Sequence, residues 1–164
     1  MTDDSGNLSA PATVTVTVGG RSCPCSLFSQ VTPSGATVDD DPVEVGVRFR
    51  SDQAGTITGL RYYRGAGWTG SFVGHLWRAD GTQLAAVPFP AAASAGWQQV
   101  ALPQPVRIDA DTVYVASFFS PDGFYVADAN YFGTAYDAAP LHAPTTPNGV
   151  FSYGGGFPLS LIHI

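Results

Sequence analysis

The sequence has no lysine, a single glutamate and few charges of either sign, with charged residues making up 12% of its 164 positions. Its 7 basic residues, all arginine, are outnumbered by 13 acids, which gives a formal net charge of −6. Nucleic-acid binding needs a positive field that displaces counterions, and anionic membranes attract polybasic segments. The charge balance therefore predicts no nucleic-acid partner and no attachment to an anionic membrane.

Long hydrophobic runs and helical periods are missing as well. No segment is apolar over the roughly 20 residues that a helix needs to cross a bilayer. The start, Met1 to Asp4, lacks the basic and apolar regions of a signal peptide. No segment repeats its apolar residues with the period of about 3.6 that marks an amphipathic helix. We therefore expect almost no helix and no membrane insertion.

Cysteine is scarce, with only Cys23 and Cys25 present, on either side of Pro24. Zinc sites usually need a second cysteine pair or nearby histidines, and the sequence has neither. A disulfide across one residue would be strained. Two alternatives stay open: a pair of thiols, or an unusual local disulfide in an oxidising compartment. We assign neither a catalytic role.

What the sequence does contain is a series of strand patterns between residues 44 and 126. One of them alternates apolar residues with polar or small ones, at Val45, Val47 and Phe49. The following patterns are bounded by turn-forming residues: GTITGLRYYR, FVGHLWRA, QLAAVPF, WQQVAL, VYVASFFS and FYVA. Asp80-Gly81 predicts a two-residue hairpin turn between two of them. We expect an all-β fold, an antiparallel β-sandwich of jelly-roll type, over residues 21–158.

The two ends of the chain differ from this pattern. Within residues 1–20, threonine and valine alternate in TVTVTV, which resembles the closing strand of bacterial immunoglobulin-like or fibronectin-like modules. Such modules occur in tandem on secreted proteins, so we expect a piece of a longer extracellular or cell-surface chain with such modules as neighbours. The last residues, 159–164, spell LSLIHI, which is typical of a translated adapter sequence. We interpret them as a non-native tail and disregard His163.

The central sequence also resembles one family. The stretches GVRFRSDQAGTITGLRYYRGAGWTGSFVGHLWRADGTQLA and GWQQVALPQPVRIDADTVYVASFFSPDGFY are similar to the bacterial domain-of-unknown-function 4082 family. The likeness runs from Cys23 to Phe157 and includes CPCSLF and PLHAPTTPNGVFSYG. This family occurs beside immunoglobulin-like modules and in some carbohydrate-active secreted proteins. It has no assigned catalytic residues, and its closing strand is replaced here by the tail.

A candidate binding site follows from the order of the strands. Connections alternate between the two ends of an antiparallel sandwich, so four loops should share one end. They bring together Asp39, Asp41 and Asp122 with Trp68, which lies in the glycine-rich stretch GAGWTGS. An exposed ring beside carboxylates can stack on the apolar face of a sugar while the acids accept hydroxyl hydrogen bonds. The alternative is that Trp68 folds back as a lid over the end of the sandwich.

The three adjacent acids Asp39, Asp40 and Asp41 are also a candidate calcium site. Calcium is a hard cation that takes six to eight oxygen ligands, and it would relieve the repulsion between neighbouring carboxylates. The alternative is a solvated acidic loop, because the spacing is not that of an EF-hand. Calcium is therefore a possible cofactor in our prediction.

Other residues with chemical potential have weaker support. Trp77 and Trp97 lie inside strand patterns, where core packing is the expected role. His75 is expected to be a hydrogen-bonded sheet residue, and His142 lies in a loop without supporting residues. Gly-x-Ser-x-Gly is absent, and small sandwiches seldom form a glycosidase cleft. The late loop contributes further aromatic residues, to cover a sheet face or form a second surface: Tyr125, Tyr131, Phe132 and Tyr136.

These observations predict a non-catalytic accessory module of a bacterial extracellular or cell-surface protein. We expect it to bind a glycan or similar surface polymer through the loop end that carries Trp68. The rival interpretation is a structural spacer or interaction domain in which every aromatic residue serves packing. The third interpretation is that the protein is a hydrolase.

Overall fold

A computed structural model of the protein describes residues 23–28, 32–33, 35, 37–38, 41–91, 94–126, 135–144 and 148–161. In these ranges the chain forms strands and turns and contains no helix, as the lack of helical periodicity predicted. None of the described residues therefore belongs to a helix that could cross a membrane. The predicted terminal strand of a preceding module, within residues 1–20, lies outside the described residues.

The strands are short and follow one another closely. They are β1 (Thr37–Val38), β2 (Val43–Ser51), β3 (Gly55–Arg64), β4 (Val73–Arg78), β5 (Gln83–Pro88), β6 (Gly96–Ile108), β7 (Tyr114–Ser120), β8 (Phe124–Tyr125), β9 (Tyr136–Ala138), β10 (Leu141–Ala143), β11 (Gly149–Tyr153) and β12 (Ser160–Leu161). The stretches singled out in the sequence correspond to β2 through β8. Their β-branched and aromatic residues favour a pleated, half-buried surface.

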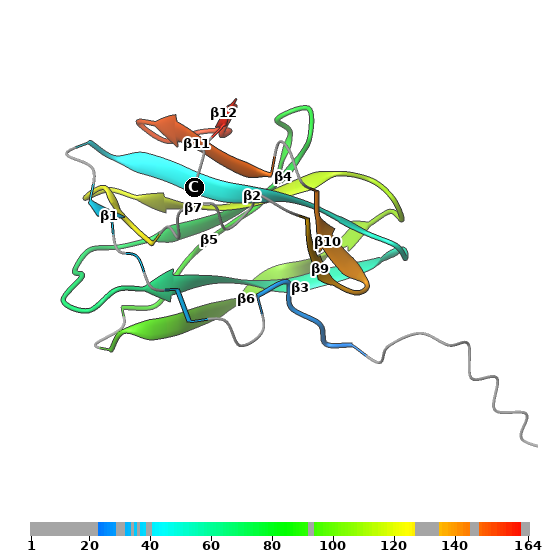
Figure 1. The fold of residues 1–164 in the computed structure, drawn as a ribbon, viewed down its shortest axis with the longest axis horizontal. Coiled ribbons are helices and arrows are strands. Elements are labelled where there is room, and N and C mark those ends of the chain that lie inside the picture. Colours follow the sequence, from blue (N-terminus) through cyan, green and yellow to red (C-terminus); the bar gives the residue numbers. More distant parts are fainter. Residues whose placement is uncertain are drawn as a thin grey trace, which may run out of the picture.

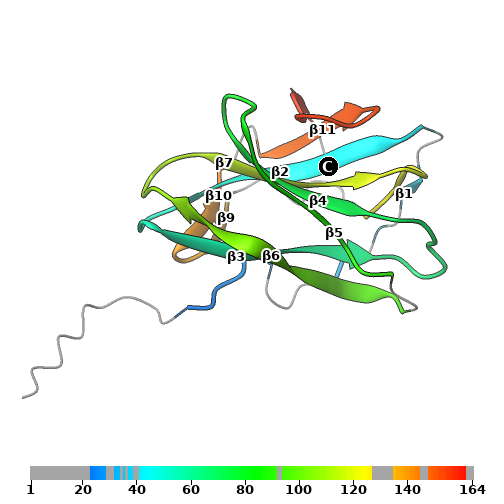
Figure 2. The ribbon, with the colours of Figure 1, turned by 180° about the vertical axis from the view of Figure 1, so that it is seen from behind.

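The strands form two layers (Figures 1 and 2). The larger sheet has the order β12-β11-β2-β7-β4-β5, and the hairpin of β9 and β10 extends it beside the end of β2. The second layer consists of β3 paired with β6, and β1 pairs with β8. Every described pairing is antiparallel. The expected all-β antiparallel sandwich is confirmed, and its jelly-roll character stays a prediction.

The predicted hairpin between β4 and β5 is present, with a longer turn than expected. Backbone hydrogen bonds join Arg78 to Thr82 and Gly81 to Arg78, so residues 79–81 form the loop. Gly81 has a φ of +90°, and the amide of Thr82 donates to Asp80 Oδ1. A type I turn followed by a glycine in the left-handed region is the usual three-residue hairpin connection.

The hydrophobic core lies between the two layers. One cluster centres on the Trp68 end and contains Leu60, Tyr62, Trp68, Phe72, Val87, Phe89 and Leu102. A second lies toward the other end and contains Leu27, Phe49, Leu76, Ile108, Tyr114 and Ala143. Leu27 belongs to the N-terminal segment 23–28, so this segment is part of the sandwich.

The outer face of the larger sheet is also covered. After β11, Gly154, Gly155 and Gly156 all have positive φ values (+75°, +85° and +89°), which suit glycine because it has no Cβ. Phe157 then packs on Trp77 of β4 with ring centroids 5.7 Å apart, and Pro158 is fully buried. Residues 154–158 therefore form a strap across this face. The strap leads into β12, which lies within the predicted tail 159–164; that the tail is non-native stays a prediction.

Candidate functional site

The sandwich brings the predicted loops to one end. Val43 pairs with Ser120, Val73 with Phe119 and Arg64 with Gly96, so the connections beside these residues are neighbours. The carboxylate of Asp122 lies against Gly70, where an added Cβ would stand 2.5 Å from Asp122 Oδ2. The described parts of these loops therefore lie at the same end of the sandwich. Asp41 and Asp122 are exposed there, whereas Asp39 and Asp40 lie outside the described residues.

The expectation of an exposed Trp68 is wrong, because this residue is 7% exposed and belongs to the core. Its ring stacks on Phe124 at a centroid distance of 5.5 Å. The ring also lies against Phe72, with centroids 6.3 Å apart, and against the backbone of Gly65, where an added Cβ would stand 2.5 Å from the indole. The Arg64 guanidinium donates a hydrogen bond to the Trp68 carbonyl. Trp68 thus closes the end of the sandwich, which confirms the alternative interpretation.

A cavity of ≈ 520 Å³ lies between the two layers, where it separates β2 and β7 from β3. Its inner wall is apolar and is formed by Val45, Val47, Phe49, Ala116 and Phe118. The opposite wall is β3 from Ile57 to Tyr63, and the segment from Pro24 to Phe28 borders the cavity. Leu141 of the β9–β10 hairpin also lines the cavity.

Aromatic rings gather where β3 and β6 meet this cavity. Trp97 pairs in register with Tyr63, and their rings meet edge to face with centroids 5.5 Å apart. The Arg61 guanidinium lies 4.2 Å from the centroid of the Trp97 ring, and Phe28 is stacked at 6.4 Å. Trp97 is half-buried, unlike Trp77, which is buried as expected. The core-packing role predicted for Trp97 is therefore corrected to a place on the cavity rim.

Polar groups accompany these rings. Arg61 Nη1 donates to Ser26 Oγ at 3.1 Å, and Gln99 is the register partner of Arg61 and also lines the cavity. Burial lowers the pKa of Arg61 from its usual value. Rings that offer apolar contact beside a guanidinium, an amide and a hydroxyl suit a ligand with apolar faces and hydroxyl groups. The sequence alone does not reveal this set, because the set depends on the pairing of β3 with β6.

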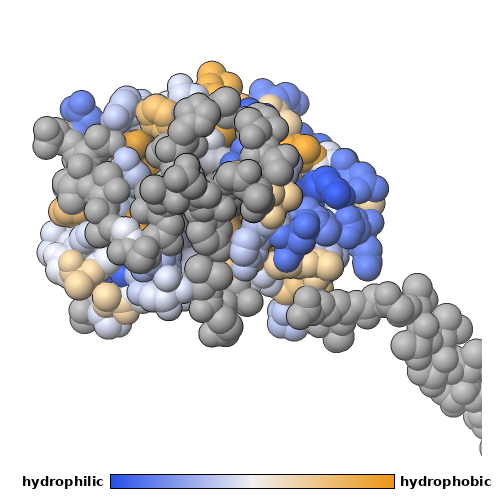
Figure 3. All heavy atoms as spheres, in the orientation of Figure 1, coloured by the Kyte–Doolittle hydropathy of each residue, from blue (hydrophilic) through white to orange (hydrophobic). Residues whose placement is uncertain are grey.

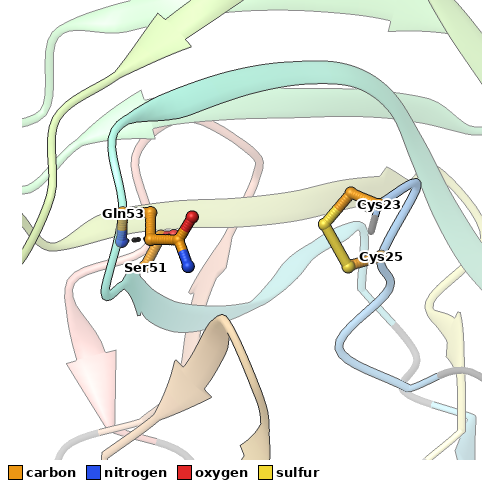
Figure 4. The surroundings of a disulfide bond; sticks show 4 residues. All are labelled: Cys23, Cys25, Ser51 and Gln53. Atoms are coloured by element: carbon orange, nitrogen blue, oxygen red, sulfur yellow. Dashed lines mark hydrogen bonds between the residues drawn. A yellow bond between two sulfur atoms is a disulfide. The ribbon is translucent and has the colours of Figure 1, made fainter. Parts of the chain in front are cut away.

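The cysteines form a disulfide at the edge of this cavity. Cys23 and Cys25 are bonded across a sequence separation of 2, and Cys25 lines the cavity. Figure 4 shows the bond on the N-terminal segment, together with Ser51 and Gln53 at the turn between β2 and β3. Of the two alternatives left open by the sequence, the structure has the local disulfide.

We expect reduction of this disulfide to lower the free energy of unfolding by only about 1–2 kcal/mol, because loop-closure entropy grows with loop length and this loop is minimal. Urea unfolding with and without a phosphine reductant measures the difference. A Cys23→Ser/Cys25→Ser variant should match the reduced protein. Complete unfolding on reduction would contradict the expectation.

A buried polar cluster lies beneath the strap on the outer face. Glu44 is 0% exposed, and its Oε1 accepts hydrogen bonds from Ser117 Oγ at 2.5 Å and from His75 Nδ1 at 2.9 Å. Trp77 Nε1 donates to Ser117 Oγ at 2.8 Å. His75 is therefore a hydrogen-bonded sheet residue, as expected. The serine proton points to a carboxylate and not to the imidazole, so this is not the arrangement of a nucleophilic triad.

A second polar cluster lies at the end opposite Trp68, around His142. Nδ1 of His142 is 2.5 Å from Asp137 Oδ1, and Nε2 is 2.6 Å from Asp52 Oδ2. Arg50 Nη1 contacts Asp52 Oδ1 and Asp111 Oδ1, both at 2.8 Å. The prediction that His142 lies unsupported in a loop is wrong, because it lies on β10 and bridges two carboxylates. Asp137 reaches His142 within the β9–β10 hairpin, whereas Asp52 is 90 positions away and is brought to it by the pairing of β10 with β2.

No group of three or more metal-ligating side chains occurs among the residues that the structure describes. The predicted calcium ligands Asp39 and Asp40 are outside these residues, and Asp41 alone is described. The calcium site therefore stays a prediction.

Comparison with known proteins gives a family but no characterised relative. The chain matches none of the curated proteins. Over residues 30–163 it matches the profile of one family, which agrees with the resemblance seen in the sequence. The chain belongs to the family described as a domain of unknown function, DUF4082.

Proposed function

We propose that this domain is a non-catalytic accessory module of a bacterial extracellular or cell-surface protein and that it binds carbohydrate. The binding site in this proposal is the cavity rimmed by Trp97 and Tyr63, in place of the buried Trp68. The observation that carries the proposal is the gathering of aromatic rings and hydrogen-bonding side chains around one cavity.

Aromatic rings beside polar side chains suit a sugar, because a sugar has both apolar faces and hydroxyl groups. Its C–H faces pack on aromatic rings, and its hydroxyl groups need hydrogen-bond partners. Trp97 and Tyr63 supply rings, and Arg61 and Gln99 supply donors and an acceptor at the same rim. The cavity volume of ≈ 520 Å³ lies within the range of roughly 300–1,000 Å³ that small-ligand sites occupy.

A non-catalytic role is supported by the state of the polar side chains. Ser117 is 7% exposed and donates to Glu44, so its hydroxyl faces a carboxylate and has no histidine base. An extracellular setting is supported by the Cys23–Cys25 disulfide, since disulfides persist in oxidising compartments. Neighbouring immunoglobulin-like modules remain the partners that we propose within the same chain.

We expect Trp97→Ala to weaken polysaccharide binding by tenfold or more, because buried aromatic anchors contribute on the order of 2 kcal/mol or more to a binding interface. Affinity electrophoresis over a polysaccharide panel, with and without calcium, measures this effect. Tyr153→Ala is a matched control, since Tyr153 is 55% exposed and does not line the cavity. Circular dichroism would verify that both variants fold.

The rival function is a structural spacer or interaction domain. It is favoured by the use of Trp68 and Trp77 in packing, at 7% and 6% exposure. Affinity electrophoresis over the same polysaccharide panel distinguishes carbohydrate binding from a spacer role. A spacer binds no polysaccharide in the panel, with or without calcium. Equal binding by wild type and Trp97→Ala would instead reject the cavity as the site.

A further inference from the structure

The two hydrogen bonds of the His142 ring depend on whether the imidazole is protonated. Both ring nitrogens of His142 face carboxylate oxygens, at 2.5 Å to Asp137 and 2.6 Å to Asp52. Carboxylates only accept hydrogen bonds, so both nitrogens must carry hydrogen, and only the imidazolium form does. The side chain is 16% exposed, which limits its contact with water as an alternative partner. The observed geometry is therefore that of a protonated histidine.

The charges around His142 come from four elements. Asp137 lies on β9, Asp52 follows β2, Arg50 lies at the end of β2, and Asp111 lies in the turn between β6 and β7. The cluster holds three carboxylates and one permanent cation. Figure 3 shows hydrophilic surface at the right-hand end, where these turns lie in Figure 1. The carboxylates already outnumber the cations, so loss of the imidazolium charge increases the excess of negative charge.

The hairpin that carries His142 has few described ladder contacts, and apolar side chains on it, Ala143 among them, pack into the second core cluster. β10 pairs with β2 through Leu141–Ser51 and His142–Arg50, and the pairing described for β9 is with β10. The amide of Asp52 also donates to the carbonyl of Pro140 at 2.9 Å. A short element with few ladder contacts depends strongly on its side-chain anchors.

This hairpin is also a wall of the cavity. Leu141 lines the cavity, and Tyr136 packs on Phe28 with ring centroids 5.3 Å apart. Phe28 in turn stacks on Trp97. Movement of β9 and β10 would therefore alter the rim where we place the ligand.

We infer that the contact of His142 with Asp137 and Asp52 is a pH-sensitive latch that holds the β9–β10 hairpin as a wall of the cavity. When the imidazolium loses a proton, one nitrogen becomes a lone-pair acceptor that faces a carboxylate. One of the two hydrogen bonds is then lost, and the released carboxylate repels its neighbours. The latch is closed with His142 protonated and loosens with His142 neutral. The effect on ligand binding rests on the proposed function, whereas the effect on the hairpin does not.

The pKa shifts of His142 and Asp52 give the direction in which the latch responds to pH. The hydrogen bond that His142 donates to Asp137 raises the pKa of His142 above the usual 6.5; burial opposes this shift, and the contact with Asp52 adds to it. The hydrogen bond from His142 lowers the pKa of Asp52 below the usual 3.8. A histidine whose pKa is higher in the folded than in the unfolded protein stabilises the fold. This stabilisation is complete below the unfolded-state pKa and is lost as pH rises through the folded-state pKa. The latch therefore loosens on the alkaline side of about pH 6.5.

The first test is independent of any ligand. Hydrogen exchange of the amides from Tyr136 to Ala143 is measured between about pH 6 and about pH 9, with correction for intrinsic exchange rates. We expect protection of this hairpin to fall by about twofold to fivefold across the His142 titration, the size of a partly exposed ion pair. An NMR titration of the His142 ring locates the transition, and Asp137→Asn should move it to lower pH.

Two variants make this test specific. In His142→Gln, the hairpin amides should show low protection from hydrogen exchange at every pH, without the step-like fall in protection that accompanies the His142 titration. Asp111→Asn removes a charge from the same cluster without contacting His142, so its step should remain. Hairpin protection that is independent of pH in the wild type, or a step that persists in His142→Gln, would overturn the latch.

The second test separates the latch from the binding proposal. A polysaccharide that the panel identifies should bind more weakly above the His142 transition in the wild type and without such a change in His142→Gln. Failure of every polysaccharide to bind would reject the proposed function and leave the hydrogen-exchange result standing. A ligand that binds equally on both sides of a confirmed hairpin transition would reject the link between latch and cavity.

Discussion

Trp68→Ala is expected to lower the free energy of unfolding by about 3–5 kcal/mol, the cost of removing a large buried aromatic side chain. The indole fills the space between Phe124 and the backbone of Gly65, and neither neighbour can move inward without disturbing the core cluster. Because domains of this size are stable by only about 5–15 kcal/mol, the loss is a large fraction of the total. Urea unfolding followed by tryptophan fluorescence measures it.

Thr69→Ala is the matched control, since Thr69 lies in the same loop and is exposed. It should stay within about 0.5 kcal/mol of the wild type. A Trp68→Ala protein with unchanged stability but lost polysaccharide binding would instead restore the exposed tryptophan of the sequence-based hypothesis. The experiment thus decides between the two roles that the sequence left open.

Glu44→Ala is expected to cost about 2–4 kcal/mol, because it leaves the buried hydroxyl of Ser117 and the ring of His75 without their acceptor. Glu44 is completely buried, so water cannot easily replace its carboxylate. Glu44→Gln keeps the shape and one acceptor oxygen, and it should lose less. Chemical unfolding of the two variants gives both values.

A double-mutant cycle tests whether this cost comes from the hydrogen bond. Glu44→Ala and Ser117→Ala should be coupled by about 0.5–3 kcal/mol, since the residues are in direct contact. Glu44 Oε2 has no described hydrogen-bond partner, so it adds desolvation cost without a compensating bond. Independent effects of the two substitutions would show that volume, and not the polar contact, determines the loss.

Much of the fold was predictable because its signals are local. The alternation of Val45, Val47 and Phe49 predicts β2 directly, since side chains of a strand alternate between two faces. Asp80-Gly81 marks the turn between β4 and β5, although the actual loop is one residue longer. The grouping of loops at one end required only the antiparallel order of successive strands.

The candidate site was predictable only in part. Asp41 and Asp122 do lie at one end, but the period of a strand says nothing about a tryptophan in a loop. Trp68 is buried because Gly65 lacks a Cβ and Phe124 offers a stacking partner from a distant strand. Trp97 reaches the rim of a cavity for a related reason, since its surroundings depend on β3 and the N-terminal segment.

The sequence by itself determined the all-β class, the positions of the main strands, the family and the charge that disfavours nucleic acid. These properties depend on residue type and on spacing between near neighbours. The tertiary structure alone decided which aromatic rings are buried, where the cavity opens and that His142 meets Asp52. Such contacts join distant segments, as the 90 positions between Asp52 and His142 illustrate, and their geometry is set by strand register and by which sheet each strand joins.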